Sequence, residues 1–168
     1  MGLPRGGQAQ RADAQPDMLE MLYMPEKGAP LVYIALEQPT GAHLLTPDQE
    51  ELAVPVTLRY LSDDPLAVHF VFPAWISLDE EEVTWTFARS LLEEGLGGPA
   101  GLGTVRLRPY GPAHTVVELH APQGIAAVRF DTRALHRFLL RSYTVTEPGG
   151  EPLEPALDRG LASLFGAV

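Results

Sequence analysis

Residues 54–72 read VPVTLRYLSDDPLAVHFVF, and apolar side chains occupy every second position on both sides of Ser62–Pro65. Such alternation is typical of strands with one buried face. The Ser-Asp-Asp-Pro run between the two halves has the residue types that β-turns favour. We therefore predict a β-hairpin that pairs Val54–Tyr60 with Leu66–Phe72.

Residues 83–108 read VTWTFARSLLEEGLGGPAGLGTVRLR and change period within the stretch. Large apolar residues alternate with threonine over Val83–Phe87, which predicts a third strand. Leucines then continue at helical spacing up to Gly95, which stands where a left-handed helix C-cap is common. A short helix is expected there, followed by the glycine-rich connection Gly95–Gly103 and a strand at Val105–Arg108.

The rest of the chain repeats both patterns. Further strands are expected at Leu31–Glu37, Thr115–Ala121 and Ile125–Phe130. A helix capped by Asp131 or Thr132 has Leu135, Phe138 and Leu139 on its inner face, and a last helix carries Leu157, Leu161, Leu164 and Phe165. Hairpin-connected strands with few helices indicate an α+β fold, here a mostly antiparallel sheet of about six to seven strands with two to three helices.

Three segments are distinguished by composition. Residues 1–30 are poor in periodic apolar side chains and predict a flexible extension, whose methionines Met18–Met24 can form one amphipathic turn against a partner or include the true translation start. Residues 31–145 form the predicted α+β domain. Residues 146–168 are expected to be a linker and a C-terminal helix that complete the same domain.

Composition limits the classes of function. The 168 residues include 22 Asp and Glu against 12 Lys and Arg, a net charge of −10, which disfavours nonspecific nucleic-acid binding. Cysteine is absent, which excludes disulfides and thiolate chemistry. The apolar stretch Leu66–Leu78 is shorter than the ~20 residues of a membrane-spanning helix. No secretory signal is evident, so a cytoplasmic location is expected.

Motifs for catalysis are missing from the sequence. The five histidines stand alone at helical and strand spacing, no Gly-x-Ser-x-Gly elbow surrounds any serine, and the lone lysine, Lys27, is in no P-loop. Adjacent carboxylates in Asp63-Asp64 and Asp79–Glu82 share one loop environment, which does not separate their pKa values for acid–base work. We therefore expect no catalytic residue, no cofactor and no metal site.

Two groups of side chains remain as binding candidates. Arg133, Arg137 and Arg141 form a basic stripe on the outer face of the predicted second helix, which is either a solvated surface or a site for an acidic partner. Trp85 and Phe87 can stack nucleic-acid bases on a sheet face, although their alternation with Val83 favours packing in the core.

One set of residues within 54–106 is distinctive in its order and spacing: Arg59-Tyr60, Asp64-Pro65, Ala67-Val68, Val83, Trp85, Phe87-Ala88-Arg89, Leu91-Leu92, Gly95-Leu96, Pro99, Gly101, Gly103 and Val105-Arg106. This pattern resembles the SsgA-like family of actinomycete sporulation and cell-division proteins. The resemblance continues more weakly to about residue 145, and Leu66, Ser90 and Thr104 depart from common family residues, which leaves the subtype open.

The resemblance implies a non-enzymatic adaptor with a fold like that of the whirly single-stranded nucleic-acid binders, assembled as a homotrimer. It implies a role in placing septa and directing septal peptidoglycan synthesis, through the tubulin-like division GTPase FtsZ or other SsgA-like proteins, with recruitment from the cytoplasm to the septum. The alternative is a single-stranded nucleic-acid-binding module of the same fold. For the adaptor we expect a partner face made of Arg89, Gly97, Gly101, Gly103, Arg106 and Arg108.

Overall fold

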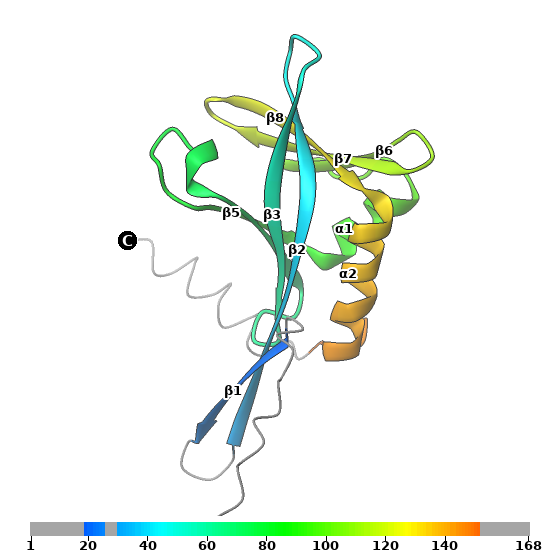
Figure 1. Cartoon of the computed structure of the whole chain (residues 1–168). Coiled ribbons are helices and arrows are strands. Elements are labelled where there is room, and N and C mark those ends of the chain that lie inside the picture. The colour runs from blue at the N-terminus through cyan, green and yellow to red at the C-terminus, as the bar shows by residue number, and fades with distance from the viewer. Residues whose placement is uncertain (1–18, 26–29, 152–168) are drawn as a thin grey trace, which may run out of the picture.

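The alternating stretches become strands of one antiparallel sheet in a computed structural model that describes residues 19–25 and 30–151 (Figure 1). The strands follow the spatial order β5-β4-β3-β2-β8-β7-β6, and β1 pairs with the remaining edge of β2. They are β1 Leu19–Pro25, β2 Pro30–Leu45, β3 Glu51–Leu61, β4 Ala67–Phe72, β5 Val83–Ala88, β6 Val105–Tyr110, β7 His114–Ala121 and β8 Gly124–Asp131. The helices are α1 Arg89–Gly97, α2 Thr132–Val145 and the short 3-10 helix η1 Ala74–Ile76. The predicted fold class is confirmed.

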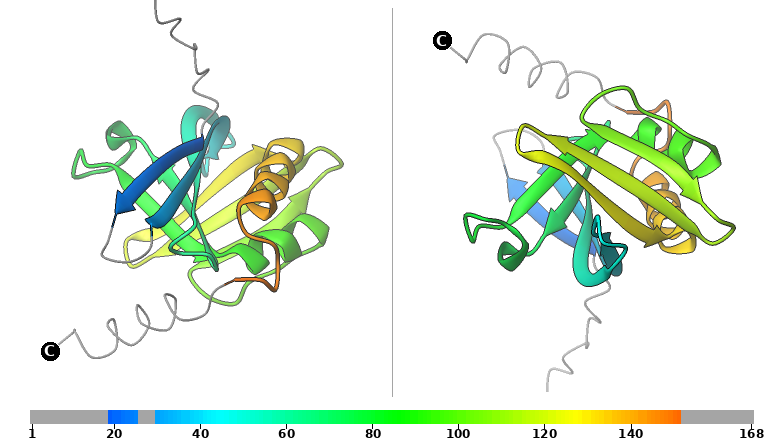
Figure 2. Two further views of the ribbon diagram at one scale, coloured as in Figure 1. Left: turned by 90° about the horizontal axis from the view of Figure 1, so that it is seen from below. Right: turned by 90° about the horizontal axis from the view of Figure 1, so that it is seen from above.

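The sheet consists of two meanders, each followed by a helix. We call β2–β5 the first half-sheet and β6–β8 the second half-sheet. Within the described residues their backbones pair only where Ala42–Leu45 of β2 lies beside Ala127–Phe130 of β8. Figures 1 and 2 show the second half-sheet crossing β2 and β3 at a steep angle, with α1 and α2 side by side against the sheet.

Strand β2 is longer than predicted. The sequence indicates a strand at Leu31–Glu37, but β2 continues to Leu45 through Pro39 and Gly41, two residues that usually interrupt strands. Pro39 is tolerated because it lies between the residues of β2 that pair with β1 and those that pair with β8. No described strand requires its missing amide hydrogen at that edge.

Strand β1 was not among the predicted strands, because it lies in the segment expected to be a flexible extension. Its residues pair antiparallel with the first half of β2, from Leu19 opposite Leu36 to Pro25 opposite Pro30. The amphipathic turn expected near Met18–Met24 is therefore extended backbone over its described part. The predicted helix that carries Leu157 and Phe165 lies outside the described residues.

The core fills the angle between the two half-sheets and the helices. Phe70 on β4 makes edge-to-face contacts with Phe87, at 4.9 Å between ring centroids, and with Phe130 on β8, at 5.3 Å. The predicted inner face of α2 is confirmed, because Leu135, Phe138 and Leu139 are buried. Asp131 caps α2 by accepting a hydrogen bond from the Arg133 amide at 2.8 Å.

The prediction that Gly95 is a left-handed C-cap is wrong. Helix α1 continues to Gly97, and the Gly98 amide donates to the Glu94 carbonyl at 3.1 Å. Gly95 is buried inside the helix, where a Cβ atom would overlap the side chain of Leu107 on β6. A glycine is required there because α1 approaches the sheet closely and leaves no space for a side chain. A left-handed backbone conformation is not the reason.

Candidate functional site

The glycine-rich connection between α1 and β6 folds back on the edge of the sheet. Ala100 and Leu107 exchange two backbone hydrogen bonds of 2.9 Å each, so the connection covers part of the outer edge of β6. Gly101 has a φ of +99°, a conformation that favours glycine, and its position against the Val105 carbonyl leaves no room for a Cβ. The predicted partner loop is therefore a defined turn.

This turn and the outer face of β6 and β7 enclose a surface groove of about 370 Å³, which we call the arginine groove. Its lining residues are Pro99, Ala100, Gly101, Leu102, Arg106, Leu107, Arg108 and Glu118. Three of the predicted partner residues, Gly101, Arg106 and Arg108, thus come together. The exposed Gly97, at the end of α1, and the exposed Gly103, on the connection, lie outside this lining.

The two arginines of the groove differ in how their charge is compensated. Arg108 Nε lies 3.4 Å from Glu118 Oε1, whereas Arg106 Nε donates to the Gly103 carbonyl at 3.2 Å. Hydrogen bonds from His120 and Arg108 lower the pKa of Glu118 despite its partial burial, so this carboxylate is ionised at neutral pH. Among the described residues Arg106 forms no ion pair, so its exposed charge is available to a ligand.

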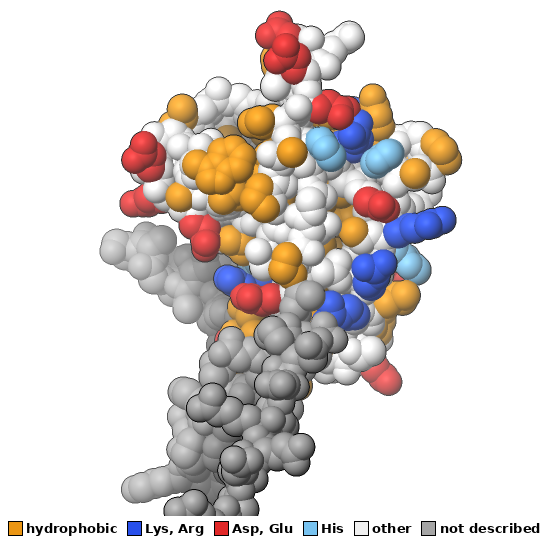
Figure 3. Space-filling view, viewed as in Figure 1, with side chains coloured by type: hydrophobic (Ala, Val, Ile, Leu, Met, Phe, Trp, Pro, Cys, Tyr) orange, Lys and Arg blue, Asp and Glu red, His pale blue; other side chains and the backbone are white. Residues whose placement is uncertain are grey.

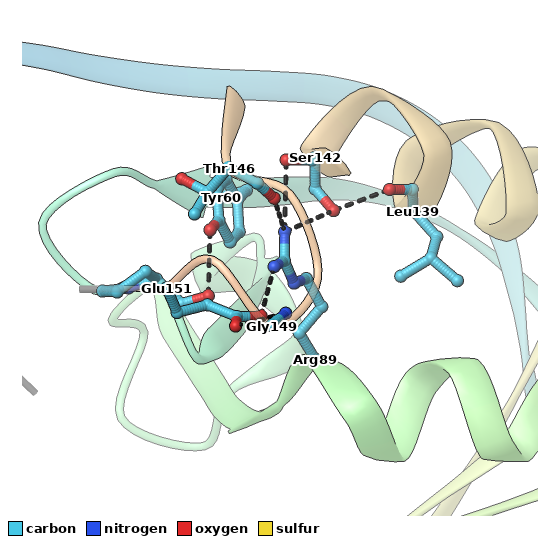
Figure 4. A network of polar contacts seen from close by, with 8 residues as sticks. Tyr60, Arg89, Leu139, Ser142, Thr146, Gly149 and Glu151 are labelled. Atoms are coloured by element: carbon cyan, nitrogen blue, oxygen red, sulfur yellow. Dashed lines mark hydrogen bonds and ion pairs between the residues drawn. The ribbon is translucent and has the colours of Figure 1, made fainter. Parts of the chain in front are cut away.

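Arg89 does not lie on this surface, so the prediction that it shares an exposed face with Arg106 is wrong. Only 3% of its side chain is exposed. Its guanidinium lies over the ring of Tyr60, 4.8 Å from the centroid (Figure 4), and over the ring of Tyr143 at 4.9 Å. Alternation along β5 is interrupted at Arg89, where α1 begins, and the side chain turns inward.

Arg89 instead binds the segment that follows α2. Its Nη1 donates to the carbonyls of Ser142, at 3.2 Å, and Thr146, at 2.8 Å, and its Nη2 forms an ion pair with Glu151 Oε1 at 2.6 Å. The carbonyls belong to the last turn of the helix, where the negative end of the helix dipole favours a cation. Figure 4 shows α1, α2 and residues 146–151 converging on this one side chain.

The surroundings of Arg89 shift the pKa of nearby groups in opposite directions. Burial raises the pKa of the Tyr60 hydroxyl, which donates to the Pro65 carbonyl at 2.9 Å. The pKa of Glu151 is lowered. Partial burial by itself would raise it, but the hydrogen bonds that the carboxylate accepts from Arg89 and from the Gly149 amide have the larger effect. Glu151 is therefore a carboxylate that fixes the guanidinium in place.

The predicted basic stripe lies along α2, as Figure 3 shows by the Lys and Arg side chains over that helix. Arg133 and Arg137 are exposed, and Arg141 is half-buried with its Nη1 at 3.4 Å from Gln38 Oε1. The buried Gln38 also donates to the Ala134 carbonyl at 2.9 Å, which fastens α2 to β2. The stripe and the arginine groove lie on different elements. Helix α2 packs mainly on α1, β2 and β8, whereas β6 contributes Arg106, Leu107 and Arg108 to the groove.

A second hollow, of about 330 Å³, was not predicted, and we call it the apolar groove. It lies between the half-sheets, bounded by the β2–β3 hairpin, the η1–β5 segment and the β7–β8 turn. Its lining residues are Leu44, Val54, Phe72, Ile76, Ser77, Val83, Trp85, Leu119, Ala121, Gln123, Gly124, Ile125, Ala126 and Val128. The sequence carries little signal for it, because the same alternation predicts a filled core.

Trp85 and Phe87, for which the sequence left packing in the core and base stacking open, lie in different places. Phe87 is 7% exposed and packs against Phe70, so it belongs to the core and offers no ring to a base. Trp85 is half-buried and lines the apolar groove, two residues further from the helix.

Residues 19–25 and 30–151 hold no group of three or more histidine and acidic side chains placed to bind a metal ion. None of the three described helices has the length and apolar character needed to cross a bilayer.

Comparison with known proteins decides the family. The family model described as Streptomyces sporulation and cell division protein, SsgA, matches residues 54–151, more than half of the chain. The chain belongs to the SsgA-like family. The predicted resemblance is thereby confirmed.

Relatives within the SsgA-like family are similar over most of their length. The sporulation-specific cell division protein SsgB of Streptomyces coelicolor is 39% identical over 125 residues, which cover 73% of this chain and 89% of SsgB. SsgB of Salinispora tropica is 39% identical over 134 residues, which cover 76% of this chain and 93% of that protein. These names support a role in sporulation cell division for this SsgA-like chain.

Solved structures of the SsgA-like family share the fold. A structure of SsgB, described with mutations that correlate to longitudinal cell division during sporulation of S. coelicolor, aligns with a TM-score of 0.62 at 38% identity and covers 70% of this chain and 92% of its own. The SsgA-like protein of Thermobifida fusca aligns with a TM-score of 0.64 at 29% identity, covering 84% and 100%.

Proposed function

We propose that this SsgA-like chain is a non-enzymatic adaptor that recruits the division GTPase FtsZ and septal peptidoglycan synthesis to the sporulation septum. The observation that carries the proposal is the arginine groove, which presents the unpaired charge of Arg106 on an exposed strand of a chain with a net charge of −10. A local basic site on an acidic surface attracts an acidic partner segment while the rest of the molecule repels other anions.

The groove suits a partner better than it suits a reaction. Gly101 and the Ala100–Leu107 backbone pair hold its wall in one conformation, so little ordering is needed when a partner binds. Its polar groups are two arginines and the carboxylate of Glu118, which can orient an acidic segment by charge.

Assembly strengthens such contacts. The trimer that the family resemblance implies would present three arginine grooves, and each weak contact would then gain from the others through multivalency. Multi-angle light scattering on the purified protein, with and without FtsZ, measures this directly. A trimer that co-elutes with FtsZ supports the adaptor, and a monomer that ignores FtsZ contradicts it.

Charge reversal tests the groove itself. In Arg106→Glu, we expect a fluorescent fusion to lose its septal foci because an acidic partner would be repelled. Arg133→Glu is the matched control, since it introduces the same exposed charge on α2. Circular dichroism establishes that both variants are folded, and normal septal foci in Arg106→Glu would contradict the proposal.

The basic stripe on α2 favours a second candidate function, binding of single-stranded nucleic acid. Arg133 and Arg137 are exposed one helical turn apart, but the net charge of the chain opposes phosphate binding. A salt-dependent shift of a labelled oligonucleotide that is lost in Arg133→Glu/Arg137→Glu would favour this candidate over the adaptor.

A further inference from the structure

The apolar groove has an exposed hydrophobic rim. Trp75 and Leu78, on either side of the lining residue Ser77, have exposed fractions of 58% and 94%, and Ile125 at the start of β8 has 65%. Figure 3 shows hydrophobic side chains gathered on this face of the molecule. A contiguous apolar patch around a hollow is typical of a surface that another chain covers.

One end of the groove is strongly acidic. Ser77 and Val83 both line it, and the chain between them includes the four exposed carboxylates of Asp79–Glu82. Among the described residues none of these four forms an ion pair, whereas Glu51 near the β2–β3 turn is paired with Arg129. The groove therefore combines apolar walls with uncompensated negative charge at one end.

The groove is also bordered by an open strand edge. Val83 and Trp85 belong to β5, which is the last strand of the sheet path, and within the described residues no strand pairs with its outer edge. An extended segment that pairs with such an edge directs alternate side chains to the same face as Val83 and Trp85. This geometry suits an extended ligand with apolar residues at every second position.

We propose that the apolar groove binds an extended segment of a partner protein in which alternating apolar side chains are flanked by lysine or arginine. The apolar side chains fill the hollow between the half-sheets, and the basic residues meet Asp79–Glu82. The site is separate from the arginine groove, because Leu119 and Glu118 are consecutive on β7 and point to opposite faces of the sheet.

Intrinsic fluorescence gives a direct test on the full chain. Its two tryptophans, Trp75 and Trp85, lie at the rim and in the wall of the groove. The probe is a tryptophan-free synthetic peptide in which valines alternate with threonines and lysines flank both ends. We expect it to shift the tryptophan emission to shorter wavelength on binding, and to bind more weakly at about 1 M salt, where charges are screened beyond about 3 Å.

Two variants test separately the apolar rim and the acidic loop of the proposed peptide site. Ile125→Ser removes an exposed apolar side chain of the rim, and we expect it to raise the half-saturating peptide concentration about tenfold or more. Asp79→Asn/Glu80→Gln/Glu81→Gln/Glu82→Gln should weaken binding and abolish its salt dependence. Leu102→Ser is the matched control, because Leu102 is 98% exposed in the arginine groove, and it should leave peptide binding unchanged.

Each other outcome overturns the proposal. If a glutamate-flanked peptide binds as tightly as the lysine-flanked one, the acidic loop does not recognise basic residues. If Ile125→Ser binds the peptide as tightly as the parent protein, the apolar groove is not the binding site. If no peptide binds but light scattering shows a self-association that Ile125→Ser abolishes, the groove is an interface between copies of this chain. The test does not involve FtsZ, so its failure and that of the proposed function are distinguishable.

Discussion

The guanidinium of Arg89 joins parts of the chain that are far apart in sequence. Its partners Ser142, Thr146 and Glu151 lie 53, 57 and 62 residues further along. A buried cation is tolerated only when its donors are satisfied, and here carbonyls, a carboxylate and two aromatic rings share that role. Arg89 therefore stabilises the fold, although the sequence pattern that resembles the family includes it and predicts it on a partner face.

Removal of this side chain tests its structural role. In Arg89→Ala, the carbonyls of Ser142 and Thr146 lose a buried donor, while Glu151 can turn toward water. We expect the free energy of unfolding to fall by about 3 kcal/mol, the lower end of the range for a broken buried ion pair. Urea denaturation measures it, with the exposed Arg133→Ala as a control expected to change stability by less than about 0.5 kcal/mol.

His69 makes the stability of the fold depend on pH. Burial lowers its pKa below the ordinary 6.5, and nearby Asp64 only partly offsets this effect. Protons therefore bind the unfolded chain more readily, so the neutral imidazole stabilises the fold above about pH 6.5 and this contribution is lost as the pH falls.

Urea denaturation at pH 7.5 and at pH 5.5 checks this sign. The parent protein should lose stability at the lower pH, and His69→Gln should lose less because it has no proton to take up there. His136→Gln, on the exposed face of α2, is the control and should behave like the parent. An equal loss in His69→Gln and in the parent would contradict the assignment.

For single residues, the sequence predicts burial correctly where the strand pattern of adjacent residues decides it. Val56, Leu58 and Phe70 stand at every second position of their strands and are buried as expected. The burial of Arg89 cannot be read from alternation, because its partners become neighbours only when α2 and residues 146–151 fold over α1.

Helix α1 shows why two glycines in one element differ. Gly95 lies where the helix contacts Leu107, whereas the space around a Cβ at Gly97 is empty. Glycine is intrinsically unfavourable in helices by about 1 kcal/mol relative to alanine, so it is retained at Gly95 for packing.

Alanine substitutions separate the two effects. Gly95→Ala should destabilise the protein by about 1–3 kcal/mol, because the added methyl group overpacks the contact with β6. Gly97→Ala should stabilise it by up to about 1 kcal/mol through helix propensity. Thermal unfolding of the two variants compares them, and a gain of stability in Gly95→Ala would show that α1 does not lie close to β6.

Strand β2 illustrates the limit of prediction for whole elements. Its first part alternates clearly, but Pro39 and Gly41 conceal the second part, which pairs with both β3 and β8. Proline is acceptable there only because of where neighbouring strands begin and end, and that information is absent from the local sequence. The resemblance identified the family, yet it did not locate the apolar groove, whose walls come from three separate hairpins.

For the whole molecule, the arginine groove and the apolar groove lie on opposite faces of the second half-sheet. An adaptor with this arrangement can hold two partners at once without competition. We expect Arg106→Glu to leave the half-saturating concentration of the lysine-flanked peptide within about twofold of the parent value, as for distant independent sites. The tryptophan titration measures it, and a larger change would show that the two surfaces are coupled.

The narrow contact between the half-sheets has a mechanical consequence. Among the described residues, backbone pairing across it is limited to Ala42–Leu45 with Ala127–Phe130, and the Glu51–Arg129 ion pair and the Phe70–Phe130 contact reinforce it. Opposite walls of the apolar groove belong to different half-sheets, so its width changes when this seam bends. Bending at these four paired positions, which the shared core resists, would therefore change how well the proposed extended segment fits between the two walls.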